Sequence, residues 1–292
     1  MNFPKITVGV PTYNRLDFLK IMSASLYRSD LSLSPNIRIY DDCSSEFDRD
    51  ALRMLFPTAK TITINNVNLR SDKNIYQMYV DFMSTDDEYF FNADSDIIFD
   101  SKWLNRAMEM MEETDGVLTL FNTRNHKPYG IINDTLCLKH TIGSAGTMFR
   151  RERIADILDC FDALKKIEGF DWQWSGYLKD RGIKIYCVNN SLVQHIGYTG
   201  QNSILSFDVG KGFKIETVED GQVINDIFVD CIDKLRQENE FFLKRHEKLN
   251  NSLLYHLYKC VTIPIKKILP KPLANRLIKI NNERMLKNKR KP

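Results

Sequence analysis

The chain has 292 residues, of which 43% are hydrophobic and 27% charged, a composition typical of a globular protein with a sizeable core. No stretch approaches the roughly 20 uncharged apolar residues that span a bilayer, and the first residues lack a secretory signal pattern. The net charge is +3, and none of the six cysteines forms a C-x-x-C pair, which argues against a zinc or redox motif. We therefore expect a cytoplasmic protein.

Strand-like and helix-like segments alternate through the first half of the chain. The expected strands are ITVGVPTY (6–13), IRIYDD (37–42), TITINN (61–66), EYFFNAD (88–94) and GVLTLFN (116–122). The expected helices lie between them: one capped by Asn14 with Leu16, Leu19, Met22 and Leu26 inward, then ALRMLF (51–56), NIYQMYVDFM (74–83) and SKWLNRAMEMMEE (101–113), capped by Ser101.

The pattern is looser after residue 122. Residues 123–135 are expected to form a loop, and residues 136–152 have strand character around a glycine-rich centre. DWQWSGYLKDRG (171–182) predicts a helix closed by Gly182, IKIYCVNN (183–190) predicts a strand, and helices are expected from about Phe207 onward.

This alternation predicts an α/β fold with a mostly parallel sheet and helices on both faces. Ligands of such sheets gather beyond the carboxyl ends of the strands. Four successive expected strands end in polar residues, which the fold would bring to one rim: Thr12, Tyr13, Asn14 and Arg15; Asp41 and Asp42; Asn65 and Asn66; Asp94 and Asp96.

Asp94 and Asp96 flank Ser95 at the end of the fourth expected strand. Two carboxylates one residue apart can reach a single hard cation such as Mg²⁺ or Mn²⁺, which prefers oxygen ligands and keeps positions open for phosphates. The bare tripeptide suits a capped turn equally well, and so do Asp41 and Asp42. The position of the motif at the shared rim favours the metal site.

Five motifs in order, VGVPTYNR, YDDCS, NADSDI, GFDWQW and QHIG, resemble the inverting GT-A glycosyltransferases of family 2 over roughly residues 5 to 200. The resemblance implies a GT-A fold and transfer of a sugar from a nucleotide-sugar, usually a UDP-sugar. It also implies nucleotide contacts from the first three motifs and the segment after the third strand, at Pro11, Thr12, Tyr13, Asn14, Arg15, Asp41, Asp42, Arg70, Asp94 and Ser95.

The same resemblance implies that Asp94, Asp96 and His195 hold the metal and that Asp171 is the general base. A divalent cation stabilises the diphosphate leaving group, while a carboxylate on the opposite face takes the proton of the attacking hydroxyl. That geometry inverts the anomeric centre. Asp171 could instead cap its helix, and His195 could be a core histidine.

Trp172 and Trp174 are candidates for stacking on a sugar ring, but residues two apart on a helix do not share a face, so at most one meets the acceptor. Gly146 lies in a glycine-rich segment that would let the backbone approach the donor sugar, or that simply bends a strand. Asn92 and Phe170 depart from the family pattern, because acids often stand at these positions. A retaining mechanism therefore stays open.

The C-terminal segment is strongly basic. From Lys244 onward it contains 14 Lys or Arg and two acids, about +12, which leaves about −9 for the rest of the chain. Apolar and basic residues alternate there, which indicates an amphipathic segment attracted to an anionic membrane surface. A solvated tail, or packing on its own domain or a second subunit, stays open. Nucleic acid is not expected because no binding module is recognisable.

These observations predict a GT-A domain over residues 1–205, with a nucleotide-binding half (about 1–100) and an acceptor-binding half (about 101–205), and a helical basic region over residues 206–292. The expected function is metal-dependent transfer from a nucleotide-sugar to a glycan or lipid-linked acceptor in surface polysaccharide synthesis, on the inner face of the membrane. A sugar-1-phosphate nucleotidyltransferase and a non-catalytic nucleotide-sugar-binding protein are the alternatives. A homo-oligomer stays open.

Overall fold

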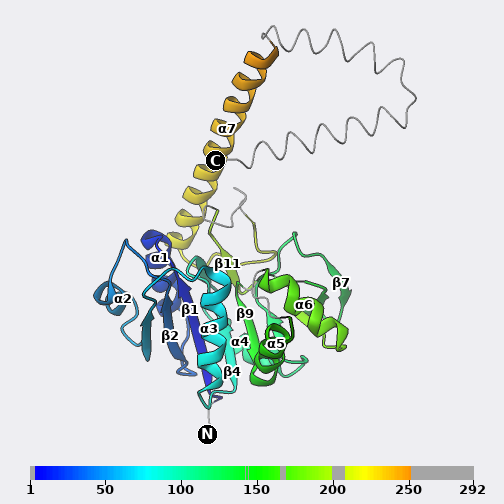
Figure 1. Cartoon of the computed structure of the whole chain (residues 1–292). Helices are drawn as coiled ribbons and strands as arrows, with labels where there is room; N and C mark the ends of the chain where they lie inside the picture. Colours follow the sequence, from blue (N-terminus) through cyan, green and yellow to red (C-terminus); the bar gives the residue numbers. More distant parts are fainter. Residues whose placement is uncertain (1–3, 142, 144, 165–168, 199–207, 251–292) are drawn as a thin grey trace, which may run out of the picture. The chain divides into compact units, whose positions relative to one another are not determined.

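The computed structural model describes residues 4–141, 143, 145–164, 169–198 and 208–250 (Figure 1). Its contacts divide the chain into two compact units, Met1–Cys231 and Ile232–Pro292. The predicted domain boundary at residue 205 lies outside the described residues and stays a prediction. No helix in the described part of the chain is both long enough and apolar enough to cross a membrane.

A nine-stranded sheet forms the centre of the first unit, in the order β3-β2-β1-β4-β9-β6-β10-β8-β7. Its strands are β1 (Ile6–Thr12), β2 (Asn36–Asp41), β3 (Thr61–Ile64), β4 (Tyr89–Asn92), β6 (Val117–Thr119), β7 (Pro128–Ile131), β8 (Leu136–Lys139), β9 (Thr147–Arg150) and β10 (Ile185–Val188). Only β8 and β9 run against the other seven, as the pairings require. The predicted α/β fold with a mostly parallel sheet is confirmed.

The helices cover both faces of this sheet. They are α1 (Leu16–Arg28), α2 (Arg49–Leu55), α3 (Ser71–Met83), α4 (Trp103–Met111), α5 (Arg151–Leu164) and α6 (Phe170–Asp180). A further helix, α7 (Val218–Asn250), follows them in the chain. Buried residues of α1, α2 and α4 form one apolar cluster, and those of α3, α5 and α6 form another (Figure 1). Strand side chains alternate between the two clusters, with Phe91 in the first and Phe90 in the second, because successive residues of a strand point to opposite faces.

The N-terminal ends of two predicted helices differ from expectation. Arg15, in the left-handed conformation, precedes α1, and Lys102 precedes α4, and neither helix has a side-chain cap. The caps predicted at Asn14 and Ser101 are therefore wrong. Gly182 follows α6 with φ 71°, as predicted, since glycine adopts this conformation without steric cost.

Three short strands were not expected from the sequence. β7 lies within the predicted loop at residues 123–135, where exposed residues give no alternation of polar and apolar side chains. β5 (Ile97–Phe99) and β11 (Val193–His195) form a separate two-stranded antiparallel sheet. Strands of three residues are too short to show a period, so only the pairing reveals them.

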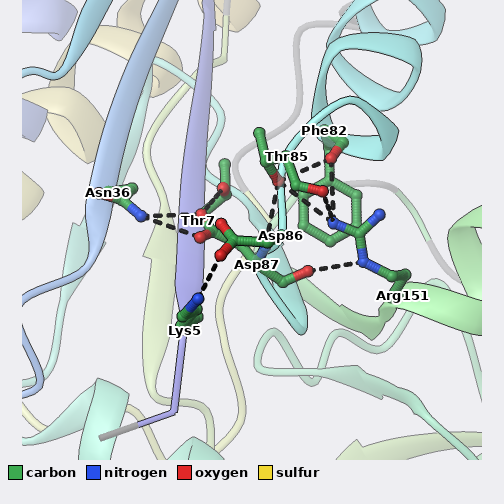
Figure 2. A network of polar contacts seen from close by, with 8 residues as sticks. All are labelled: Lys5, Thr7, Asn36, Phe82, Thr85, Asp86, Asp87 and Arg151. Carbon is green, nitrogen blue, oxygen red and sulfur yellow. Dashed lines mark hydrogen bonds and ion pairs between the residues drawn. The ribbon is translucent and has the colours of Figure 1, made fainter.

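A polar network joins the segment before β4 to β1, β2 and α5 (Figure 2). The Asp87 side chain is buried and accepts hydrogen bonds from Thr7 Oγ1 at 2.5 Å and from Asn36 Nδ2 at 2.9 and 3.0 Å. The Arg151 guanidinium donates to the backbone oxygens of Asp87 at 2.8 Å and Thr85 at 2.5 Å. The network lies where β1 and β4 begin, at the sheet edge opposite the predicted rim.

We expect Asp87→Ala to lower the free energy of unfolding by about 2–4 kcal/mol, because it leaves the buried hydroxyl of Thr7 and the amide of Asn36 without their acceptor. Urea denaturation followed by circular dichroism measures the loss. The matched control is Asp86→Ala, since Asp86 is the adjacent acid but lies exposed and pairs with exposed Lys5. Equal stability of the two variants would contradict a structural role for the buried carboxylate.

Candidate functional site

The carboxyl ends of β1, β2 and β3 meet at one rim of the sheet. The backbone N–H of Asp42 donates to the oxygen of Thr12 at 2.8 Å, and that of Asn65 donates to the oxygen of Asp41 at 2.8 Å. The amide of Asn65 also donates to the Asp42 carboxylate at 3.0 Å. The polar residues that follow the first three strands therefore lie together, as the sequence predicts.

The turn after β1 has a strained backbone. Asn14 and Arg15 have φ 50° and 60°, a region that residues other than glycine rarely adopt. The Asn14 side chain accepts hydrogen bonds from the backbone of Ser45 at 2.8 Å and Glu46 at 3.3 Å, so it holds two loops together instead of capping α1. Strain of this kind persists where the surroundings enforce it, which is common at functional sites.

Three further residues of the first motif lie on this rim. Pro11 is half-buried, and Tyr13 is 36% exposed. Thr12 is buried, and its hydroxyl has no hydrogen-bond partner among the described residues. A buried hydroxyl without a partner is costly, which makes Thr12 a candidate contact for a ligand.

The two acids after β2 both bind within the protein. Asp41 accepts hydrogen bonds from the backbone N–H and the hydroxyl of Ser44 at 3.0 and 2.5 Å, and burial nevertheless raises its pKa. Asp42 accepts from the backbone of Leu69 at 2.7 Å and so orients the segment that leads into α3. Arg70 follows, exposed and with φ 69°, at the start of that helix.

Asp96 is the centre of the site. Its carboxylate forms an ion pair with Arg15 and lies 3.2 Å from Nε2 of His195. Burial alone would raise the pKa of Asp96, but His195 and Arg15 outweigh burial and hold that pKa well below its usual range. Burial would likewise lower the pKa of His195, but Asp96 raises it. Asp96 is therefore ionised and favours a protonated His195.

Asp94, two residues earlier, lies in a different environment. Its carboxylate accepts one hydrogen bond from the amide of Asn92 at 2.7 Å. Burial and the negative charge of Asp96 raise the pKa of Asp94 to about 6. Ser95 lies half-buried between the two acids. Arg15 and His195 both contact Asp96, whereas Asp94 forms no ion pair of its own among the described residues, so the charge of Asp94 is the less well compensated of the two.

The small sheet explains why His195 reaches Asp96. β11 pairs with β5 so that His195 lies opposite Ile97, the residue after Asp96. The backbone N–H of Ile196 also donates to the backbone oxygen of Asp96 at 2.8 Å. Gly197 follows, and a Cβ atom there would overlap the Asp96 carboxylate and crowd the Arg15 guanidinium. Only glycine allows the backbone to pass this close to the site.

The donor set suits a divalent cation, although its present arrangement is not a closed cage. Among the described residues, no three His, Cys, Asp or Glu side chains are grouped as a metal site. His195 nevertheless contacts Asp96, and both interact electrostatically with Asp94; oxygen and nitrogen ligands of this kind bind Mg²⁺ or Mn²⁺. A cation would take the place of Arg15 on Asp96.

The start of α6 lies beside the rim. The backbone N–H of Gly169 donates to Asp72, in the first turn of α3, at 3.0 Å. Asp171 belongs to the first turn of α6, and its side chain lies outside the described part of the structure. Trp172 is 67% exposed, whereas Trp174 is fully buried and contacts Phe149. Trp174 is therefore a core residue, and its prediction as a sugar contact is corrected.

Gly146, the residue before β9, contacts the backbone of the segment that leads to the two acids. Its N–H donates to the backbone oxygen of Asn92 at 3.0 Å, and its φ is 66°. A Cβ atom at this position would lie 2.6 Å from the side chain of Val193. The tight bend therefore accounts for the glycine, and contact with a donor sugar stays a prediction.

The sequence did not reveal that three residues of the site contact the two acids. Arg15 was predicted to contact the nucleotide, but it also pairs with Asp96; Asn92 looked like a departure from a pattern, but it binds Asp94. Gly197 belongs to the QHIG motif, but its close approach to Asp96 was not predicted. A glycine two residues after a candidate ligand is the signal that could have revealed the close approach.

The solved structures that resemble this chain include S. aureus TarS 1–349 in complex with UDP, with TM-score 0.50 and 16% identity over 65% of this chain and 59% of that one. A structure of S. aureus TarS has TM-score 0.48 and 16% identity over 77% of this chain and 39% of the other. The chain thus matches less than two thirds of the length of either. At this identity the likeness supports the fold alone. No curated protein matches the chain significantly.

The family model described as glycosyl transferase family 2 matches residues 7–165, more than half of the chain. The match includes the turn after β1, the acids after β2, and Asp94 and Asp96, whereas His195 and α6 lie beyond it. The chain belongs to glycosyl transferase family 2.

Proposed function

We propose that this glycosyltransferase moves a sugar from a UDP-sugar to a glycan or lipid-linked acceptor, with Mn²⁺ or Mg²⁺ bound at Asp94, Asp96 and His195. The observation that carries the proposal is the contact of His195 with Asp96, together with the electrostatic interaction of both with Asp94, at the strand ends. It lies on the rim where ligands of open α/β sheets bind. The UDP complex of TarS 1–349 supports uridine as the nucleotide.

The nucleotide is assigned to the first half of the rim. Pro11, Thr12, Tyr13 and Asn14 would surround the uridine, and the Asp41–Asp42 pair would bind its ribose or base. Arg15 and Arg70 would meet the phosphates, since guanidinium groups match phosphate oxygens in geometry and charge. Asp94 and Ser95 complete the nucleotide contacts. The partnerless hydroxyl of Thr12 supports this assignment.

The bound cation would neutralise the diphosphate that leaves the donor sugar. Arg15, released from Asp96, would then be free to contact the same phosphates. Asp171 would take the proton of the acceptor hydroxyl from the opposite side, which gives inversion at the anomeric carbon. Gly146 and Trp172 would border the donor sugar and the acceptor. A retaining reaction on the same metal site is the alternative.

The basic segment from Lys244 onward would hold the enzyme on the anionic inner face of the cell membrane. Peripheral binding suits a lipid-linked acceptor in surface polysaccharide synthesis. Exposed Phe241, Phe242 and Leu243 immediately before it would add apolar contact. The sugar transferred in such a synthesis would be a hexose.

Asp96→Ala should abolish Mn²⁺-dependent binding of UDP, because it removes the ligand that both Arg15 and His195 contact. Isothermal titration calorimetry with UDP, with and without Mn²⁺, measures the effect. Asp50→Ala serves as the control, since that acid is exposed on α2. Unchanged binding by Asp96→Ala would refute the metal site.

Asp171→Asn should lower turnover by about 10²–10⁴-fold, since it removes the base but keeps the size of the side chain. UDP binding with Mn²⁺ should survive, which separates the loss of the base from misfolding. The control is Asp180→Asn, an exposed acid at the other end of α6. Undiminished turnover would show that another residue takes the proton. Survival of binding with no turnover in the unmodified chain would favour a non-catalytic protein.

Ending the chain after Phe242 should release the protein from liposomes that contain anionic lipid, because it removes a net charge of about +12. Co-sedimentation at low and high salt measures this, with neutral liposomes as the control. Equal binding of the shortened and full-length proteins would contradict the membrane role of the tail.

A further inference from the structure

Of the three tryptophans in the chain, only Trp172 is exposed. Trp103 and Trp174 have no exposed surface, whereas 67% of Trp172 is accessible. Both Trp172 and Trp174 lie on α6, so the helix buries one indole and leaves the other in solvent. A single exposed apolar side chain needs no explanation by itself, so the surroundings of Trp172 decide whether it belongs to a site.

His126 lies beside Trp172, with the ring centroids 6.1 Å apart and the planes inclined by 39°. Nδ1 of His126 lies 3.0 Å from the hydroxyl of Thr141, which fixes the orientation of the ring. Burial and the nearby Lys139 lower the pKa of His126. The imidazole is therefore uncharged near neutral pH and offers an aromatic face next to the indole.

The segment that carries His126 is held firmly. Thr123 and Asn125 both donate to the Asp208 carboxylate, the latter at 2.9 Å. The ammonium of Lys139, itself buried, donates to the backbone oxygen of Thr123 at 3.2 Å. A binding surface is effective when its side chains are fixed before the ligand arrives, and these bonds provide that condition.

A second aromatic pair lies three residues further along the chain. Tyr129, on β7, stacks on His140 with the ring centroids 4.0 Å apart and the planes within 9°. Tyr129 remains 49% exposed, so its other face is accessible. Three residues span at most about 11 Å, so the second pair lies within that distance of His126 along the backbone.

These rings lie close in the chain to residues of the proposed reaction centre. Trp172 directly follows Asp171 on α6. Thr141, the contact of His126, lies five residues before Gly146, which binds the backbone of Asn92 beside the acids. Five residues span at most about 18 Å, which a short oligosaccharide can bridge.

We propose that Trp172, His126, Tyr129 and His140 form an aromatic ledge on which several sugar rings of the acceptor stack, so that the acceptor is a neutral oligosaccharide chain. Flat aromatic side chains pack well against the apolar C–H faces of pyranose rings, and their polar tips bind hydroxyl groups. This inference rests on the proposed function, because it makes the acceptor of that reaction a chain of rings instead of a single small alcohol.

The test uses the fluorescence of the full-length protein, without metal or nucleotide. Acrylamide should quench chiefly Trp172, since the other two indoles are buried. The probes are gluco-, galacto-, manno- and N-acetylglucosamine oligosaccharides from mono- to pentasaccharide. We expect at least one series to protect Trp172 and shift its emission to the blue, with affinity rising at least tenfold from mono- to trisaccharide.

Calorimetry on variants then locates the binding. Trp172→Ala should weaken binding of the active series at least tenfold, and Tyr129→Ala should weaken only the longer members. Phe241→Ala is the matched control, because it removes another exposed aromatic ring, on α7. Circular dichroism establishes that each variant is folded.

Absence of protection by every series would overturn the ledge, and so would protection by anionic phospholipid vesicles alone, which would indicate membrane contact. Saccharide binding that Trp172→Ala leaves unchanged would also overturn it. Because no UDP or Mn²⁺ is present, these outcomes are independent of the nucleotide-binding test. Loss of UDP binding with intact saccharide binding would refute the proposed function and leave a glycan-binding surface.

Discussion

The charge on Asp96 organises the candidate site. Arg15 reaches it from the turn after β1, His195 from the end of β11, and Gly197 passes against it. These stretches lie far apart in the sequence, and a buried carboxylate requires positive or hydrogen-bonding partners. The geometry of the rim therefore depends on Asp96, whose buried charge requires Arg15 and His195 beside it.

The two acids of the motif differ because their neighbours differ. Asp96 faces two cationic groups and stays ionised, whereas Asp94 has one amide donor and a pKa raised to about 6. Identical side chains two residues apart thus lie in different electrostatic environments. Asp96 holds Arg15 and His195 in place, whereas the charge of Asp94 is the less well compensated of the two.

The local sequence pattern predicted the alternation of strands and helices in the first half of the chain. The β-rich runs and the helices between them were correct because period and composition mark them, and the shared rim followed from parallel strands. The β5–β11 pairing was not predicted, since three-residue strands carry no period, and β7 was missed because its side chains are mostly exposed. Resemblance, not spacing, pointed to His195. The roles of Asp171 and the metal ligands remain predictions, and Trp174 was settled only by its burial in the core.

The network around Asp87 has a consequence for how this enzyme can diversify. Asp87, Thr7 and Arg151 stabilise the sheet at the edge where its strands begin, away from the loops of the rim. Residues such as Tyr129 and Trp172 project from the surface and contribute little to the core. Substitutions among them can therefore accumulate at small thermodynamic cost while the same scaffold is retained.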